Sequence, residues 1–133
     1  MNEPAVIAEM LAAKTIAVVG LSADPMKPSH YVSAYMQRAG KRILPVNPLI
    51  ESVLAEKSYG SLRDLPERPD VVNVFRLPGA IPAIVDEMIE LGYTDLWVQQ
   101  GIRNPAAAAK AEAHGIRVVM DRCIMVEHRI GSY

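Results

Sequence analysis

The chain has 133 residues, 50% hydrophobic and 22% charged, a length and balance typical of one globular domain, which we expect to span residues 1–133. With a formal net charge of −1 and no basic segment, the composition gives no reason to expect a nucleic-acid partner. No apolar run approaches the roughly 20 residues of a membrane-spanning helix, so no membrane partner is expected. The single cysteine, Cys123, excludes an internal disulfide. No metal-ligand spacing is present, and a reducing, cytoplasmic location is expected.

Short β-branched runs alternate with helical segments along the chain. A first helix is predicted over residues 4–13. Continuous apolar runs, which are typical of buried parallel strands, follow at 15–19, 42–46, 71–75, 95–99 and 116–120. Further helices are predicted from a cap at Ser29 to Ala39, over 81–91, and over 105–114 after the cap residue Asn104. Residues 49–69 indicate only a short strand near Val53 and a turn near 61–65, and the tail 121–133 has no clear pattern.

Five strands that alternate with helices indicate parallel pairing with right-handed crossovers, and helices must then cover both faces of the sheet. The predicted fold class is therefore α/β: a single Rossmann-like, doubly wound domain with a mostly parallel five-stranded sheet. The expected strand order is 3-2-1-4-5.

Ligands of such sheets bind beyond the carboxyl ends of the strands, and the first strand here ends in "AVVGLS", residues 17–22. Gly20 removes a side chain where the chain turns sharply, and Ser22 offers a hydroxyl beside the amides of that turn. The helix that begins near Ser29 directs its positive end toward the same place, and Lys27 adds a full charge. These features favour a diphosphate, although Gly20 alone would also fit a purely structural turn.

The second strand ends in "PVNP", residues 45–48, where a protein that binds NAD normally carries an acidic residue for the ribose hydroxyls. Asn47 is uncharged, which disfavours NAD without excluding it. Arg76, at the end of the third strand, would suit a phosphate monoester while Phe75 lies against a base. The simpler alternatives are that Phe75 belongs to the core and Arg76 is a solvated surface residue.

The segments "AVVGLSADPMKPSHYV", "ILPVNP", "DVVNVFR", "LWVQQGI" and "VVMDRC" occur in this order, and the series resembles the stand-alone CoA-binding domain proteins of bacteria. These are similar to the N-terminal CoA-binding domain of the succinyl-CoA synthetase α subunit. The resemblance covers residues 10–128. It implies coenzyme A as ligand and a cofactor-binding set of Gly20, Leu21, Ser22, Lys27, Asn47, Pro48, Val74, Phe75, Arg76, Gln100 and Gly101. The synthetase's phosphohistidine lies in a second domain absent from this chain, so acyl-CoA synthesis is not implied.

No catalytic constellation is identified, and an enzymatic activity is not expected. Cys123 is the only candidate nucleophile; it would form a mixed disulfide with the CoA thiol, or it is simply a buried apolar residue. We therefore expect a non-catalytic carrier, sensor or accessory module for CoA or a short acyl-CoA. A small NAD(P)-binding oxidoreductase domain and a regulatory module with a decayed pocket are the alternatives. A homodimer, through the first helix or the tail 124–133, or a partner enzyme stays open.

Overall fold

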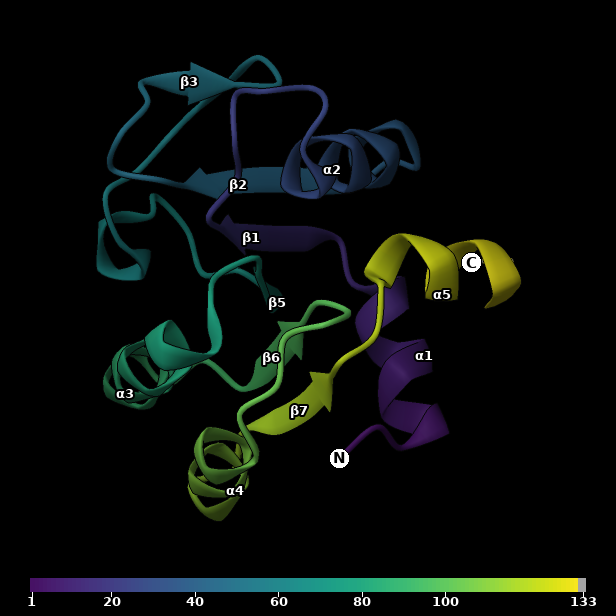
Figure 1. Cartoon of the computed structure of the whole chain (residues 1–133), viewed down its shortest axis with the longest axis vertical. Coiled ribbons are helices and arrows are strands. Elements are labelled where there is room, and N and C mark those ends of the chain that lie inside the picture. The colour runs from purple at the N-terminus through teal and green to yellow at the C-terminus, as the bar shows by residue number, and fades with distance from the viewer. Residues whose placement is uncertain (132–133) are drawn as a thin grey trace.

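The computed structural model describes residues 1–131, and its centre is a five-stranded parallel sheet (Figure 1). The strands follow the order β2-β1-β5-β6-β7. Their bounds are β1 Thr15–Val19, β2 Arg42–Val46, β5 Val71–Val74, β6 Asp95–Val98 and β7 Arg117–Met120. A two-stranded antiparallel hairpin, β3 Ser52–Val53 with β4 Glu56–Lys57, lies beyond β2.

Helices cover both faces of the sheet, as the uninterrupted apolar strands require (Figure 1). α1 Pro4–Ala12, α2 Pro28–Arg38 and α5 Ile124–Gly131 pack on one face. α3 Ile81–Leu91 and α4 Pro105–Ala113 pack on the other, and short 3-10 turns cover Leu62–Asp64 and Pro78–Ala80. Successive residues of β1 point to opposite faces of the sheet. Ile16 and Val18 belong to the core beneath α1, α2 and α5, and Ala17 and Val19 belong to the core beneath α3 and α4. The predicted α/β, doubly wound class is confirmed.

The predicted strand order is of the right type, but one strand needs reassignment. The third position, outside β2, is taken by Tyr59, which forms a parallel bridge with Val46. The run 71–75, counted as the third strand from the sequence, instead pairs with β1 as the fourth. The sequence hides this because a single bridging residue leaves no apolar run of strand length.

One helix prediction is corrected, and one helix was not predicted. α2 begins at Pro28, with Lys27 at the cap position, so Ser29 lies inside the first turn and does not cap the helix. The tail contains a helix, α5, because its apolar residues Ile124 and Met125 pack against α1 and α2. Residues 132–133 lie outside the described residues. They end both the expected domain and the tail that was considered for a dimer contact.

Residues 1–131 contain neither a membrane-spanning helix nor a cluster of metal-binding side chains. No helix there combines the length and the apolar character that crossing a membrane requires. No group of three or more His, Cys, Asp or Glu side chains within this range is arranged to hold a metal ion.

Candidate functional site

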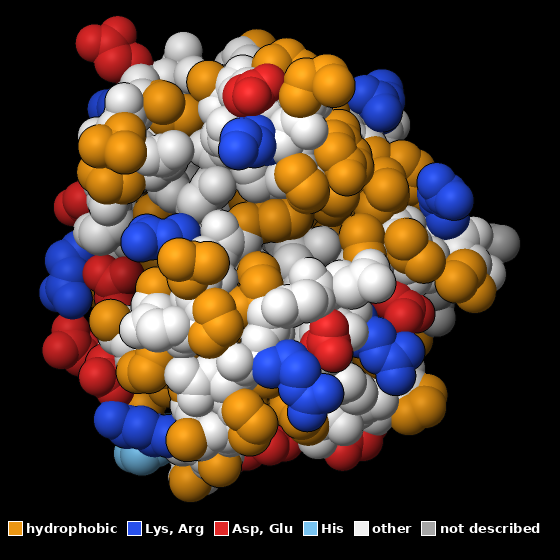
Figure 2. Space-filling model, viewed as in Figure 1, with side chains coloured by type: hydrophobic (Ala, Val, Ile, Leu, Met, Phe, Trp, Pro, Cys, Tyr) orange, Lys and Arg blue, Asp and Glu red, His pale blue; other side chains and the backbone are white. Residues whose placement is uncertain are grey.

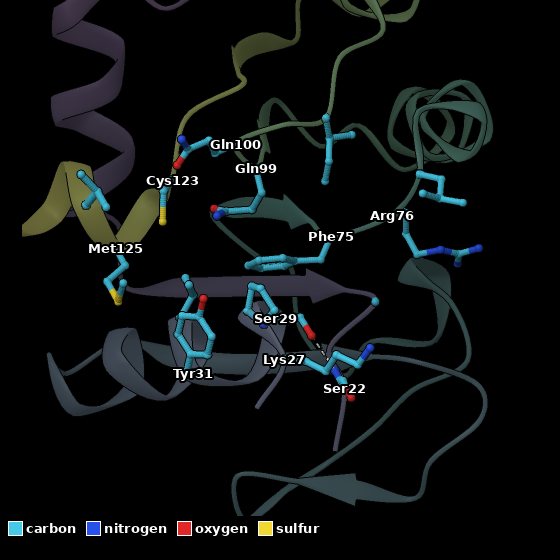
Figure 3. Close-up of a pocket in the computed structure, with 16 residues that line it drawn as sticks. Ser22, Lys27, Ser29, Tyr31, Phe75, Arg76, Gln99, Gln100, Cys123 and Met125 are labelled. Carbon is cyan, nitrogen blue, oxygen red and sulfur yellow. Dashed lines mark hydrogen bonds between the residues drawn. The ribbon is translucent and has the colours of Figure 1, made fainter. Parts of the chain in front are cut away.

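A cavity of about 680 Å³ opens at the carboxyl ends of β1, β5 and β6, on the face covered by α2 and α5 (Figure 3). The register explains its position, because Asn73 of β5 pairs with Trp97 of β6, so Phe75 and Gln99 follow two residues later on the same face. The lining residues come from four segments that are far apart in the sequence: Gly20, Ser22, Lys27, Pro28, Ser29, Tyr31, Val32, Phe75, Arg76, Leu77, Gln99, Gln100, Ile102, Cys123, Met125 and Val126.

The turn after β1 depends on Gly20 for two reasons. Its φ is +89°, in the left-handed region that side chains disfavour. A Cβ here would lie 2.6 Å from the carbonyl oxygen of Phe75 and 2.9 Å from Cδ of Arg76. The glycine therefore lets the ends of β1 and β5 approach each other, and it also lines the cavity.

A hydrogen-bond network fixes this turn to the start of α2. The backbone N–H of Ser22 donates to Oγ of Ser29 at 3.0 Å, and Nδ1 of His30 donates to the carbonyl of Ser22 at 2.9 Å. Because a carbonyl only accepts, Nδ1 of His30 carries the hydrogen. The Ser22 hydroxyl accepts from the backbone N–H of Asp24, and its own hydrogen stays available for a ligand.

One end of the cavity is cationic. Lys27 and Arg76 both line it and are exposed, and no carboxylate within residues 1–131 lies within ion-pair distance of either (Figure 3). The N-terminus of α2, with its partial positive charge, begins directly after Lys27. This end can hold two anionic groups without displacing a protein partner.

The other end of the cavity is apolar. Tyr31 and Val32 of α2 face it from one side, and Met125 and Val126 of α5 from the other. Tyr31 and Val126 remain 46% and 36% exposed, so this apolar surface is open to a ligand. Figure 2 shows hydrophobic side chains gathered over α2 and between α2 and α5.

Gln99 lies between the two ends and is only 4% exposed. Its Oε1 accepts a hydrogen bond from the backbone N–H of Ile124 at 3.0 Å, which fixes the orientation of the amide. Its Nε2 makes no hydrogen bond with any part of the chain that the structure describes, and the residue lines the cavity. A ligand with an oxygen acceptor would satisfy this donor.

Six of the eleven residues expected to bind a cofactor line the cavity: Gly20, Ser22, Lys27, Phe75, Arg76 and Gln100. The side chains of Leu21 and Val74 are fully buried in the two cores. Pro48 and Gly101 are exposed but are not part of the lining.

Asn47 does not line the cavity, and its side-chain amide instead forms hydrogen bonds with the backbone of two loops. Its Nδ2 donates to the carbonyl of Leu21 at 3.0 Å, and its Oδ1 accepts from the backbone N–H of Leu49 at 2.9 Å. The Nδ2 bond joins the loop after β1 to the loop after β2, and the Oδ1 bond stabilises the turn that Asn47 begins.

Several lining residues were missed or given other roles in the sequence analysis. Ser29 was predicted to cap a helix and Tyr31 was given no role, whereas both line the cavity. Gln99 carried a signal that was overlooked: it is a polar residue at the end of the apolar run "DLWVQ". Met125 and Val126 carried no such signal in the sequence, because they reach the cavity only through the position of α5.

The cavity at the carboxyl edge of a parallel sheet, with a cationic end beside a helix N-terminus, defines a protein of the nucleotide-binding α/β class. A model of the CoA binding domain matches residues 14–129, and the chain belongs to this family. The resemblance noted in the sequence is thus confirmed at the level of the family.

The chain is also similar to individual proteins and solved structures. The uncharacterized protein YneT of Bacillus subtilis is 43% identical over 117 residues, covering 88% of this chain and 87% of its own. The structure of cell-free ID.343 from Thermus thermophilus is 42% identical with a TM-score of 0.90, over 98% of both chains. The apo dinucleotide-forming acetyl-coenzyme A synthetase 1 of Ca. Korarchaeum cryptofilum has a TM-score of 0.69 at 21% identity, over 80% of this chain and 25% of its own, and shares the fold.

Proposed function

We propose that the cavity binds coenzyme A or a short acyl-CoA, and that the protein acts as a carrier, sensor or accessory module without catalysing a reaction. The observation that carries this proposal is the division of the cavity into a cationic and an apolar end. Coenzyme A has a similar division, because its phosphates lie at the nucleotide end, whereas its pantetheine arm is uncharged and combines aliphatic carbons with two amides. Family membership supports the ligand independently.

The phosphates are assigned to groups that have no competing partner. The diphosphate lies against the Ser22 hydroxyl and the N-terminus of α2, where a donor and a positive dipole coincide. The 3′-phosphate takes Arg76, with Lys27 nearby, because a guanidinium binds a phosphate with two parallel hydrogen bonds. Phe75, half-buried at the cavity wall, provides a surface for the adenine ring.

The alternative ligand, NAD, is less well supported. Recognition of its unphosphorylated ribose usually requires a carboxylate at the end of the second strand. Asn47 occupies that position, and both atoms of its amide already hold backbone groups. A ligand whose ribose carries a phosphate needs no carboxylate there and would be repelled by one.

Thermal unfolding with a panel of nucleotides tests the proposal. Under reducing conditions CoA is expected to raise the melting temperature, since a ligand at about 100 times its Kd stabilises the folded state by about 2.7 kcal/mol. NAD, NADP and ADP at the same concentration are expected to stabilise it less. Stabilisation by NAD and not by CoA would contradict the proposal.

Calorimetric titration of Arg76→Gln tests the assignment of the 3′-phosphate. Loss of a charge-assisted pair of hydrogen bonds is expected to weaken CoA about tenfold or more, with a much smaller effect on dephospho-CoA. Arg38→Gln is the matched control, because Arg38 is an exposed arginine at the C-terminal end of α2, about 15 Å along the helix axis from the N-terminal residue Pro28. Equal losses for CoA and dephospho-CoA would show that Arg76 does not hold the 3′-phosphate.

A further inference from the structure

We infer that Cys123 is a second point of attachment in this cavity, where its thiol exchanges with a disulfide of the ligand to hold CoA as a mixed disulfide. The inference rests on the proposed function and extends it from reversible to covalent binding. Cys123 is the chain's one cysteine, and it lines the cavity together with Gln99 and Met125 (Figure 3).

The backbone around Cys123 is held on both sides by β6. Nε1 of the buried Trp97 donates to the carbonyl of Arg122 at 2.9 Å, and the N–H of Ile124 donates to Oε1 of Gln99 at 3.0 Å. One residue earlier, the N–H of Asp121 donates to the carbonyl of Val98 at 2.9 Å. The residues before and after the cysteine are therefore fixed, and its half-buried side chain is presented to the cavity with little backbone freedom.

The donor on Gln99 indicates what lies beside the thiol. Gln99 is more than nine-tenths buried, its Oε1 is used by Ile124, and its Nε2 has no partner within residues 1–131. Because this donor opens onto the cavity and makes no hydrogen bond with residues 1–131, it is available to a ligand that supplies a carbonyl oxygen. The pantetheine arm carries two amide carbonyls shortly before its terminal thiol, and no other part of CoA combines these groups.

The arrangement of the cavity agrees with the direction of that arm. Arg76 and Lys27 mark the phosphate end, and the walls from Tyr31 of α2 and Met125 of α5 continue to Cys123 (Figure 3). A ligand whose phosphates lie at the cationic end therefore brings its sulfur toward Cys123.

The exchange is balanced without a further oxidant when the incoming molecule is CoA disulfide. The thiolate of Cys123 attacks one sulfur of the disulfide, the bond between the two CoA sulfurs breaks, and a bond between Sγ and one CoA sulfur forms. The second CoA leaves as a thiolate and takes up the proton that the cysteine released. Reduction by a second thiol reverses the step.

Intact-mass spectrometry of the full chain after incubation with CoA disulfide tests the inference. We expect one adduct with the mass of a single CoA, removed by a reductant and absent from Cys123→Ser. The rate with CoA disulfide is expected to exceed that with glutathione disulfide or 2-hydroxyethyl disulfide by about tenfold or more, because the cavity concentrates the matching ligand. Arg76→Gln is expected to lower the ratio of the CoA disulfide rate to the 2-hydroxyethyl disulfide rate, and the control Arg38→Gln to keep the wild-type ratio.

Two results would overturn the inference. Absence of an adduct, while CoA stabilises the reduced wild-type protein, would mean that the site binds CoA with its sulfur away from Cys123. Equal rates with all three disulfides would mean that Cys123 is an ordinary accessible thiol. Failure of CoA to stabilise the reduced wild-type protein would instead overturn the proposed function, on which the covalent step rests.

Discussion

Replacing Gly20 by alanine is expected to destabilise the fold strongly, because the added methyl group meets fixed backbone. The φ of +89° costs a residue with a side chain about 1–2 kcal/mol. The new Cβ would also lie 2.6 Å from the carbonyl oxygen of Phe75. That oxygen has little freedom to move, since the N–H of Phe75 donates to the carbonyl of Val19 at 2.9 Å. Forcing such a contact costs about 1–3 kcal/mol more.

The sum, about 2–5 kcal/mol, corresponds to a fall in melting temperature of roughly 8–20 °C for a chain of this size. Urea unfolding followed by circular dichroism measures the free energy directly. Gly115→Ala is the matched control, because Gly115 has a φ of +81° but no heavy atom within 4 Å of the added Cβ. Its loss is expected to be about 1–2 kcal/mol, from the backbone conformation alone. If Gly20→Ala lost no more than Gly115→Ala, the proposed close packing of the two strand ends would be wrong.

Two further predictions concern the face that carries the cavity. Trp97→Phe removes the hydrogen bond to the carbonyl of Arg122 and leaves a small void in the core. The free energy of unfolding, measured in urea, is therefore expected to fall by about 2–4 kcal/mol. An unchanged free energy would contradict the anchoring role of Trp97. Burial, and then the charge of Lys41, lower the pKa of His128, which also shares a hydrogen bond with the Tyr35 hydroxyl. The unfolded chain therefore binds more protons near its ordinary pKa of about 6.5, and stability is expected to fall as the pH decreases below that value. Urea titrations between about pH 8 and pH 5.5 check this, and His128→Gln is expected to reduce the pH dependence; an equal slope in both proteins would assign it to other groups.

Much of the fold was predictable because it follows from local patterns. The five apolar runs are strands, Asn104 caps α4 by accepting from the N–H of Ala107, and Gly92 ends α3 in the left-handed conformation. The position of 71–75 in the sheet was not predictable in this way. It depends on Tyr59, whose single bridge to Val46 fills the outer position and is visible only once distant segments are brought together.

The candidate site likewise has features that follow from local sequence and features that depend on tertiary contacts. The sequence alone determined the edge of the sheet that carries the site and the turn after β1, because apolar runs end there in glycine, polar and cationic residues such as Gly20 and Arg76. Only the tertiary structure decided that Asn47 joins two loops, that Nε2 of Gln99 faces the cavity without a partner among residues 1–131, and that α5 supplies part of the apolar wall. The physical reason is that strand ends are marked by neighbouring residues, whereas the partner of a buried amide is a residue distant in the chain.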